Sequence, residues 1–242
     1  MSEIVDISLS LVTLTILELV LGIDNLVFLA IISQRLPKGE QAKARKIGLT
    51  LAWVSRLILL ASAVWIIKLK EPLISIFGFS FSGRDIFLIL GGLFLLAKAT
   101  QEIHSELEPS ASESSSKHQA INTKRVSFGM VITQIVLLDI IFSLDSVLTA
   151  IGLTDRFWLM ATAISIAIIG MVFASEPLSR FVERHPTIKM LALSFLILIG
   201  TVLIADGFHF HIPRGYIYFA MGFSLFVEVL NLIYKRRRIR SE

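Results

Sequence analysis

The sequence predicts an all-α, polytopic membrane protein with seven transmembrane helices, arranged as two inverted three-helix repeats plus one extra helix. Three observations lead to this prediction. Of the 242 residues, 55% are hydrophobic and only 17% are charged, whereas soluble proteins have about 25% charged residues. The apolar residues fall into seven runs, and most reach the roughly 20 residues that a helix needs to cross a bilayer. Acidic residues also recur at one spacing in two of these runs, which indicates a duplication.

The predicted spans follow the apolar runs in chain order. They cover residues 7–32, 47–67, 86–99, 128–153, 157–174, 188–205 and 216–233. The third run reaches the length of a span only with its flanking residues. Residues 1–6 contain two acidic residues and no basic one, so we expect no cleaved signal peptide and a retained first span.

Most basic residues lie in alternate loops, after the first, third and fifth spans and in the tail after the seventh. Because short cytoplasmic loops of membrane proteins are enriched in Lys and Arg, the amino terminus is predicted outside and the carboxyl terminus in the cytoplasm. The same distribution explains the net charge of +4 without nucleic acid as a partner.

The first and fourth spans contain similar residues at one constant offset. Thr13 matches Gln134, Glu18 matches Asp139, Gly22 matches Ser143, Asp24 matches Asp145 and Asn25 matches Ser146. Three crossings separate these spans, so they run in opposite directions. A weaker match joins residues 92–98 to residues 200–206. Inverted repeats are common in secondary transporters, although chance resemblance between apolar helices is the alternative.

These matches divide the chain into four parts. The predicted boundaries are 1–103 for the first three-helix repeat, 104–126 for a flexible cytoplasmic linker, 127–212 for the second three-helix repeat, and 213–242 for the seventh helix and basic tail. The linker is predicted to be flexible because it is rich in serine and poor in apolar residues.

The polar residues inside spans one and four are the candidate site. An ionised group inside a bilayer costs roughly 2.5–3.5 kcal/mol or more, and such groups typically mark a substrate path or proton relay. The candidate metal-binding residues are Glu18, Asp24, Asn25, Asp139, Asp145 and Ser146. Residues seven apart on a helix share a face, whereas the two aspartates Asp24 and Asp145 lie about 100° away. We therefore expect a break of each helix, at Gly22 and at Ser143, that brings all six side chains to one cavity.

The chemistry of these side chains favours a hard divalent cation. Carboxylate, amide and hydroxyl oxygens suit magnesium, calcium and manganese, and the chain has no cysteine. Arg56, at the centre of the second span, is expected to be a counter-ion. Glu228 and Asn231, in the seventh span, form either a structural helix contact or a second ion station. No permanently bound cofactor is expected, since the cation is the substrate.

Charge balance favours a role for protons. Four carboxylates and Arg56 leave three formal negative charges, so a divalent cation is expected to release protons when it binds. Exporting such a cation from a negative interior costs roughly 4.6 kcal/mol per 100 mV, and the chain has no nucleotide-binding motif to supply this. Proton antiport is the simplest hypothesis for export, whereas the potential alone could drive uptake.

Four segments resemble the TerC family of bacterial integral membrane proteins, and within it the YgdQ-like subgroup. They are residues 18–25 (ELVLGIDN), 139–146 (DIIFSLDS), 181–186 (FVERHP) and 215–221 (GYIYFAM). The resemblance covers nearly the whole chain and implies a seven-helix protein of the bacterial inner membrane. Because several members of the family are linked to manganese export, it also implies that manganese is the cation.

Three functional hypotheses follow. The first is a proton-coupled manganese exporter, which is not an enzyme and whose partners are the lipid bilayer, the cation and protons. The second is a membrane subunit or sensor that binds metal without moving it. The third is an intramembrane aspartyl protease, against which the chain lacks a Gly-x-Gly-Asp sequence. A homo-oligomer is compatible with each hypothesis.

Overall fold

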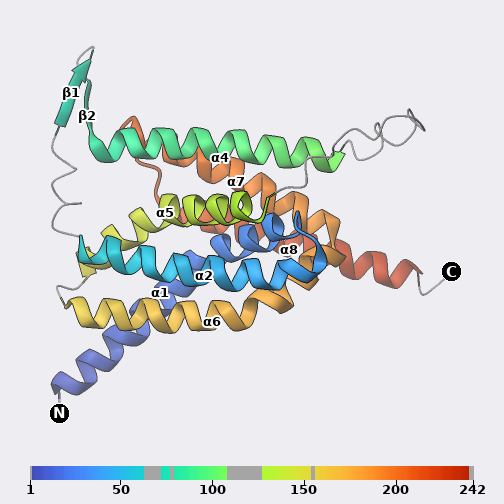
Figure 1. The fold of residues 1–242 in the computed structure, drawn as a ribbon, viewed down its shortest axis with the longest axis horizontal. Coiled ribbons are helices and arrows are strands. Elements are labelled where there is room, and N and C mark those ends of the chain that lie inside the picture. Colours follow the sequence, from blue (N-terminus) through green and yellow to red (C-terminus); the bar gives the residue numbers. More distant parts are fainter. Residues whose placement is uncertain (1, 63–71, 77–78, 108–126, 154–155, 240–242) are drawn as a thin grey trace. The chain divides into compact units, whose positions relative to one another are not determined.

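The computed structural model describes residues 2–62, 72–76, 79–107, 127–153 and 156–239 (Figure 1). Within these ranges the chain forms seven long helices and one short β-hairpin. The helices are α1 (Ser2–Ser33), α2 (Lys38–Ala61), α4 (Gly83–Leu107), α5 (Phe128–Leu153), α6 (Phe157–Arg184), α7 (Pro186–Gly207) and α8 (Arg214–Ile239). The hairpin consists of β1 (Pro72–Ile76) and β2 (Phe79–Ser82). The predicted all-α class is confirmed, and the hairpin is an addition to it.

The helices have the length and composition of membrane spans. In the described residues, α1, α4, α6, α7 and α8 are long and apolar enough to cross a bilayer, and α5 contains a shorter apolar helix at Phe128–Leu144. The amino-terminal half of α2 carries several charged residues, including Lys38, Lys43 and Lys46, which lowers its mean hydropathy. These features confirm a polytopic membrane protein.

Several helices are longer than the apolar runs that predicted them. Helix α2 begins at Lys38 and α6 continues to Arg184, through Pro177. Helix α4 continues to Leu107, into the segment predicted to be linker, and residues 108–126 of that segment lie outside the described residues. A helix does not end at the edge of its apolar run, because its charged turns can lie in water and still form backbone hydrogen bonds.

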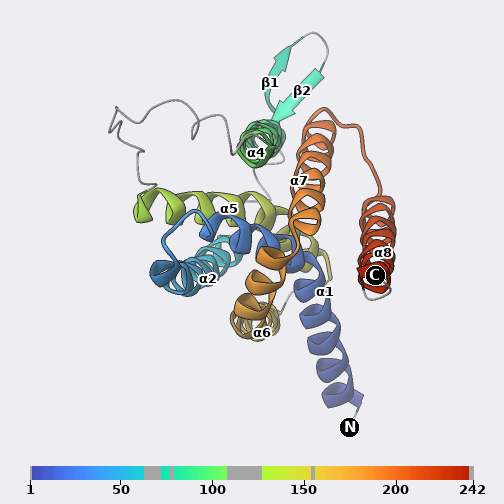
Figure 2. The same ribbon diagram turned by 90° about the vertical axis from the view of Figure 1, so that its right-hand side faces the viewer.

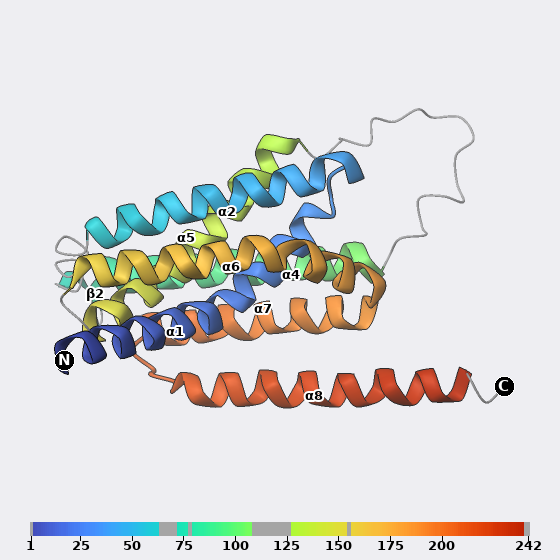
Figure 3. The same cartoon turned by 90° about the horizontal axis from the view of Figure 1, so that it is seen from below.

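The predicted breaks at Gly22 and Ser143 are wrong, because α1 and α5 are continuous helices at both positions. Figures 2 and 3 show that α1 changes direction along its length without interruption. A side chain at Gly22 would meet the end of Met171, so this glycine allows α1 to approach α6 closely. Ser143 donates its hydroxyl to the carbonyl oxygen of Ile140 in its own helix. Both residues therefore serve helix packing or internal hydrogen bonding.

The helices divide into two compact units, each described by itself. The first unit contains α1, α2, α5 and α6, and the second contains the hairpin, α4, α7 and α8. In the first unit α1 packs along α6, and α2 packs along α5. In the second unit α4 packs along α7, which also contacts α8. Each unit thus combines helices from both predicted repeats.

Matched helices run in opposite directions. In Figure 3 the colours show that α1 is antiparallel to α5, and α2 to α6, within the first unit. In the second unit α4 is antiparallel to α7. This is the arrangement expected of inverted repeats. It also agrees with the contacts in the first unit, where the pairing of α1 with α6 has its counterpart in the pairing of α5 with α2.

Two glycines at matched positions of the weaker repeat meet where α4 packs on α7. A Cβ atom added at Gly92 would lie 2.5 Å from the carbonyl oxygen of Gly200, and one added at Gly200 would lie 3.0 Å from that of Gly92. Small residues allow membrane helices to approach closely, and dispersion contacts then stabilise the pair. Gly92 and Gly200 are matched residues that touch each other, so they lie where a two-fold axis relating the two predicted repeats would pass.

Replacing Gly92 by Ala is expected to destabilise the second unit. The added methyl group meets backbone that cannot move without separating the helices, and overpacking of this kind costs about 1–3 kcal/mol. The matched control is Gly222→Ala on α8, where an added Cβ atom contacts nothing within 4 Å and alanine is the better helix former. Thermal unfolding in detergent would show a lower midpoint for Gly92→Ala than for the control. Equal midpoints would contradict the tight crossing.

Candidate functional site

Three ionisable side chains from three helices meet inside the first unit. They are Glu18 on α1, Arg56 on α2 and Asp139 on α5, which are 1%, 2% and 6% exposed. Arg56 donates from Nη1 to Glu18 Oε2 at 3.0 Å and from Nη2 to Asp139 Oδ1 at 2.7 Å. We call these three residues the charged cluster. Its one guanidinium links carboxylates at matched positions of the two predicted repeats.

Asp139 has the densest set of hydrogen bonds in the charged cluster. Besides the bond from Nη2, it accepts contacts from Arg56 Nε at 3.2 Å to Oδ1 and 3.4 Å to Oδ2. Asn25 Nδ2 donates to Oδ1 at 3.2 Å, and Ser55 Oγ donates to Oδ2 at 3.4 Å. Both carboxylate oxygens of Asp139 are therefore bound by protein donors from α1 and α2.

Two other oxygens beside the charged cluster lack donors. Among the described residues, Glu18 Oε1 and Asn25 Oδ1 are buried without a hydrogen-bond partner. An unsatisfied buried acceptor costs roughly 1–3 kcal/mol, and more when it is charged. A proton, a water molecule or a cation would satisfy these oxygens. They are available to a ligand, unlike the oxygens of Asp139.

Helix periodicity explains which side chains reach the charged cluster. Glu18 and Asn25 are seven residues apart on α1, nearly two full turns, so both face α2 and α5. Asp24 lies about 100° away on the same helix. It is half-buried and makes no hydrogen bond or ion pair with the described side chains. Asp24 is thus a carboxylate within the span that none of the described side chains neutralises.

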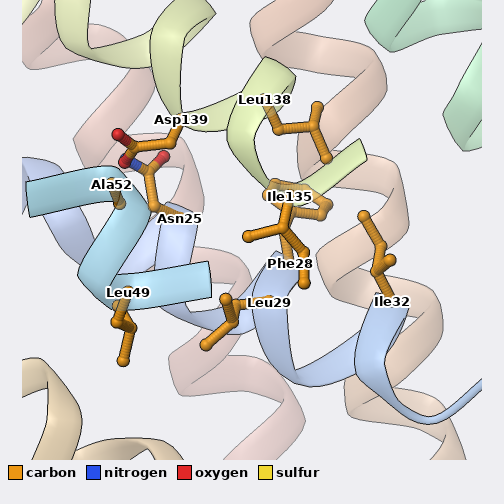
Figure 4. A pocket seen from close by; sticks show the side chains of 9 residues that line it. All are labelled: Asn25, Phe28, Leu29, Ile32, Leu49, Ala52, Ile135, Leu138 and Asp139. Atoms are coloured by element: carbon orange, nitrogen blue, oxygen red, sulfur yellow. The ribbon is translucent and has the colours of Figure 1, made fainter. Parts of the chain in front are cut away.

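A small cavity adjoins the charged cluster (Figure 4). Its volume is about 20 Å³, enough for one water-sized occupant. It lies between α1, α2 and α5 and is lined by Asn25, Phe28, Leu29, Ile32, Leu49, Ala52, Ile135, Leu138 and Asp139. Figure 4 shows Asn25 and Asp139 pointing toward each other, with Ala52 beside them and the other apolar side chains farther away.

The cavity extends from the charged cluster toward one end of the first unit. Its apolar lining leads toward the carboxyl end of α1 and the amino ends of α2 and α5. The charge pattern of the loops predicts that these ends are cytoplasmic. The apolar lining separates Asp139 from that end.

The structure brings only part of the predicted set together. Glu18, Asn25, Asp139 and Arg56 form one network, and Asp24 lies on a neighbouring face of α1. The side chains of Asp145 and Ser146 lie outside the described residues. No three carboxylate or imidazole groups in the described part of the chain are close enough to hold a metal ion by themselves.

The two residues predicted as a second ion station lie on α8, in the second unit. Glu228 is partly exposed and Asn231 is exposed. Neither makes a hydrogen bond or ion pair with the side chains that the structure describes.

Sequence reasoning missed two polar features of α2. Ser55 contacts Asp139, and no pattern in the sequence singles it out, because neighbouring residues of a helix point about 100° apart. Arg45 was assigned to a loop, but it is 3% exposed on α2 and pairs with Glu176 and Ser179 of α6. The signal was the spacing of Arg45 and Arg56, since eleven residues are about three helical turns and place both on one face.

Two further buried aspartates lie outside the predicted set of site residues. In the second unit, Asp85 is 4% exposed and Asp206 is 6% exposed. His209 Nε2 lies 3.2 Å from Asp85 Oδ2, and His211 Nδ1 lies 3.5 Å from Asp206 Oδ1. Asp85 also accepts hydrogen bonds from the backbone and hydroxyl of Ser82, which fixes the turn between β2 and α4. The contact of His209 fastens the segment after α7 to the start of α4, whereas that of His211 joins the segment to the end of α7 itself.

Fold and site together define a class of protein: a polytopic membrane protein of antiparallel helix pairs with a buried, incompletely neutralised charged cluster within its spans. The chain belongs to the TerC family, because the family described as "Integral membrane protein TerC family" matches residues 5–242. The resemblance seen in the sequence motifs is thereby confirmed.

Relatives in Escherichia coli (strain K12) extend this assignment. The chain is 52% identical over 229 residues to "UPF0053 inner membrane protein YgdQ", covering 95% of this chain and 94% of that protein. It is 49% identical over 233 residues to "UPF0053 inner membrane protein YoaE" and 50% identical over 233 residues to "UPF0053 protein YegH". These two matches cover 96% of this chain but only 44% and 43% of the relatives. No solved structure matches the chain.

Proposed function

We propose that this protein is an inner-membrane exporter of divalent cations, coupled to protons, with manganese as the favoured substrate. One observation carries the proposal. Glu18 and Asp139 are buried within membrane helices and share one guanidinium, while Glu18 Oε1 and Asn25 Oδ1 have no donor among the described residues. The charged cluster thus combines a formal negative charge with open oxygen ligands.

The position of the charged cluster supports transport. Ionised groups inside a bilayer are rare, and where they occur they typically line a substrate path. Transporters built from inverted repeats place their sites near the midplane, on helices from both repeats. Glu18 and Asp139 are matched residues on the antiparallel helices α1 and α5 and satisfy this description.

The oxygen donors support a hard divalent cation as substrate. Glu18 Oε1 and Asn25 Oδ1 are a carboxylate and an amide oxygen, the types that magnesium, calcium and manganese accept. Asp24, which has no partner in the described residues, supplies a further negative charge nearby. The preference for manganese, and for export, rests on the resemblance to the TerC family rather than on the donors.

Proton coupling follows from the charge of the site. Glu18 and Asp139 with Arg56 carry one formal negative charge, and Asp24 adds another. Buried carboxylates that lose their cation are stabilised by protons, so metal release and proton uptake are linked. The relatives YgdQ and YoaE are named as inner membrane proteins, which supports the same location for this protein. We place the amino terminus outside and the carboxyl terminus in the cytoplasm, on the distribution of basic residues.

Asp24→Asn tests this proposal with little risk to the fold. Because Asp24 has no partner among the described side chains, its neutralisation should leave stability unchanged. In proteoliposomes with an imposed pH gradient, we expect the native protein to transport manganese. We expect the flux of Asp24→Asn to be lower by about tenfold or more. Asp6→Asn, the same change at an exposed position of α1, should behave as native. Absence of flux from folded native protein, with stabilisation by manganese, would instead favour a metal-binding subunit.

A further inference from the structure

We infer that Arg56 is the internal counter-cation of the substrate-free carrier, and that it gives up its carboxylates to the divalent cation when substrate binds. This inference deepens the proposed function and rests on it. It differs from a fixed structural ion pair, in which Arg56 would hold Glu18 and Asp139 throughout the transport cycle.

Arg56 occupies most of the acceptor sites of the Asp139 carboxylate. It makes three of the five contacts, through Nε to both oxygens and through Nη2 to Oδ1, and the remaining two come from Asn25 to Oδ1 and Ser55 to Oδ2. An ionised carboxylate offers about two acceptor sites on each oxygen, so with Arg56 in place no site on either oxygen is free for a cation. Without Arg56, Asn25 and Ser55 leave a free site on each oxygen, so Arg56 is the group that must move for the cation to bind there.

The charge of the cluster also favours an exchange. Within the charged cluster, two ionised carboxylates match one divalent cation, and Arg56 with both of them leaves one negative charge. Asp24 lies on another face of α1 and makes no contact with these three side chains. A divalent cation added beside Arg56 would give Glu18, Arg56 and Asp139 one excess positive charge in a place of low dielectric constant, which is unfavourable. Exchange of Arg56 for the cation avoids this. The guanidinium therefore takes the place of the substrate when the site is empty.

Two oxygens beside the charged cluster are not used by Arg56. Glu18 binds Arg56 through Oε2, and Asn25 binds Asp139 through Nδ2. Glu18 Oε1 and Asn25 Oδ1 accept no hydrogen bond from the part of the chain that the structure describes. A cation can contact these oxygens before any ion pair breaks. Release of Asp139 by Arg56 then completes its coordination. Asn25 and Ser55 still hold the Asp139 carboxylate in position during the exchange.

This role has a consequence for the empty carrier. After it releases its substrate, a transporter must change back to the conformation that opens the empty site to the other side of the membrane. Its carboxylates must be neutralised during this change, since each uncompensated charge inside the membrane is costly. Arg56 supplies part of that neutralisation. Without Arg56, the transporter with bound cation can still change conformation in both directions, whereas the empty transporter changes conformation slowly.

Arg56→Gln tests the inference in proteoliposomes, with manganese in the purification buffer to neutralise the carboxylates. Two fluxes are compared: exchange of manganese against manganese, and net efflux into manganese-free buffer. In the variant we expect exchange to persist and net efflux to fall by at least about tenfold relative to exchange. Arg56→Lys is expected to restore part of the net efflux. Its ammonium group keeps the positive charge but cannot make the same set of hydrogen bonds to both Glu18 and Asp139.

The outcomes separate this inference from the proposed function. Native protein that shows neither flux contradicts the proposed function. Active native protein with an Arg56→Gln variant that loses both fluxes in equal proportion contradicts the inference alone. If Arg56→Gln does not fold, Arg56→Lys decides, because a fixed ion pair predicts equal loss of the two fluxes and the exchange role predicts selective loss of net efflux.

Discussion

Asp139→Ala is expected to lower the free energy of unfolding by about 3–5 kcal/mol, the cost of leaving one partner of a buried ion pair uncompensated. The change removes the acceptor of every contact that Arg56, Asn25 and Ser55 make to this carboxylate. Arg56 is 2% exposed, so water cannot replace the lost carboxylate without opening the helix packing. Unfolding in mixed micelles with increasing SDS would measure the change.

Two variants control for the stability effect. Asp6→Ala, at an exposed position on α1, should change the free energy of unfolding by less than about 0.5 kcal/mol. Adding Arg56→Met to Asp139→Ala should recover part of the loss, because the buried cation is then gone as well. If Asp139→Ala unfolds like the Asp6 control, the charged cluster is not the buried network described above.

Glu18→Gln is expected to abolish manganese transport. The variant keeps the size of the side chain and one oxygen that can accept from Arg56, but it removes a negative charge beside the open oxygens of the site. Loss of even an outer partner of a metal site costs about 10–100-fold in affinity or activity. We expect at least this loss of flux in proteoliposomes. Glu40→Gln, an exposed glutamate on α2, should transport like the native protein.

The spacing of polar residues was enough to anticipate much of the site. Glu18 and Asn25 share a face because seven residues are nearly two helical turns, and the match to Asp139 placed a second carboxylate at the equivalent depth. Arg56 was the basic residue at a span centre, and it contacts both carboxylates. A carboxylate inside the membrane needs a partner of opposite charge, and few basic residues lie near the centre of a predicted span.

The continuity of α1 through Gly22 and of α5 through Ser143 could not be derived in the same way. Gly22 is consistent with a break, with a kink and with a close helix contact, and only the position of Met171 on α6 shows that it allows the contact. The burial of Arg45 has a similar cause. Its turn of α2 reads as a basic loop in the sequence, and Glu176, its partner, comes from a distant helix. Such tertiary contacts override the local pattern.

The grouping of helices also depends on tertiary contacts. The repeats run consecutively in the sequence, yet the first unit combines α1 and α2 with α5 and α6. Packing of α1 on α6 and of α2 on α5 has no local sequence signal. The Gly92 and Gly200 pair was visible as a weak repeat match, but the contact between these two glycines is known only from the structure.

Binding of manganese to the detergent-solubilised full-length protein, measured by equilibrium dialysis with a radioactive tracer, most directly tests whether the charged cluster is the cation site. The comparison is between the native protein, Glu18→Gln and Glu40→Gln, which removes the same charge from an exposed position of α2. We predict that Glu40→Gln binds like the native protein and that Glu18→Gln binds at least about tenfold more weakly. Native-like binding by Glu18→Gln, or equal loss of binding in both variants, would contradict a cation site at Glu18, Arg56 and Asp139.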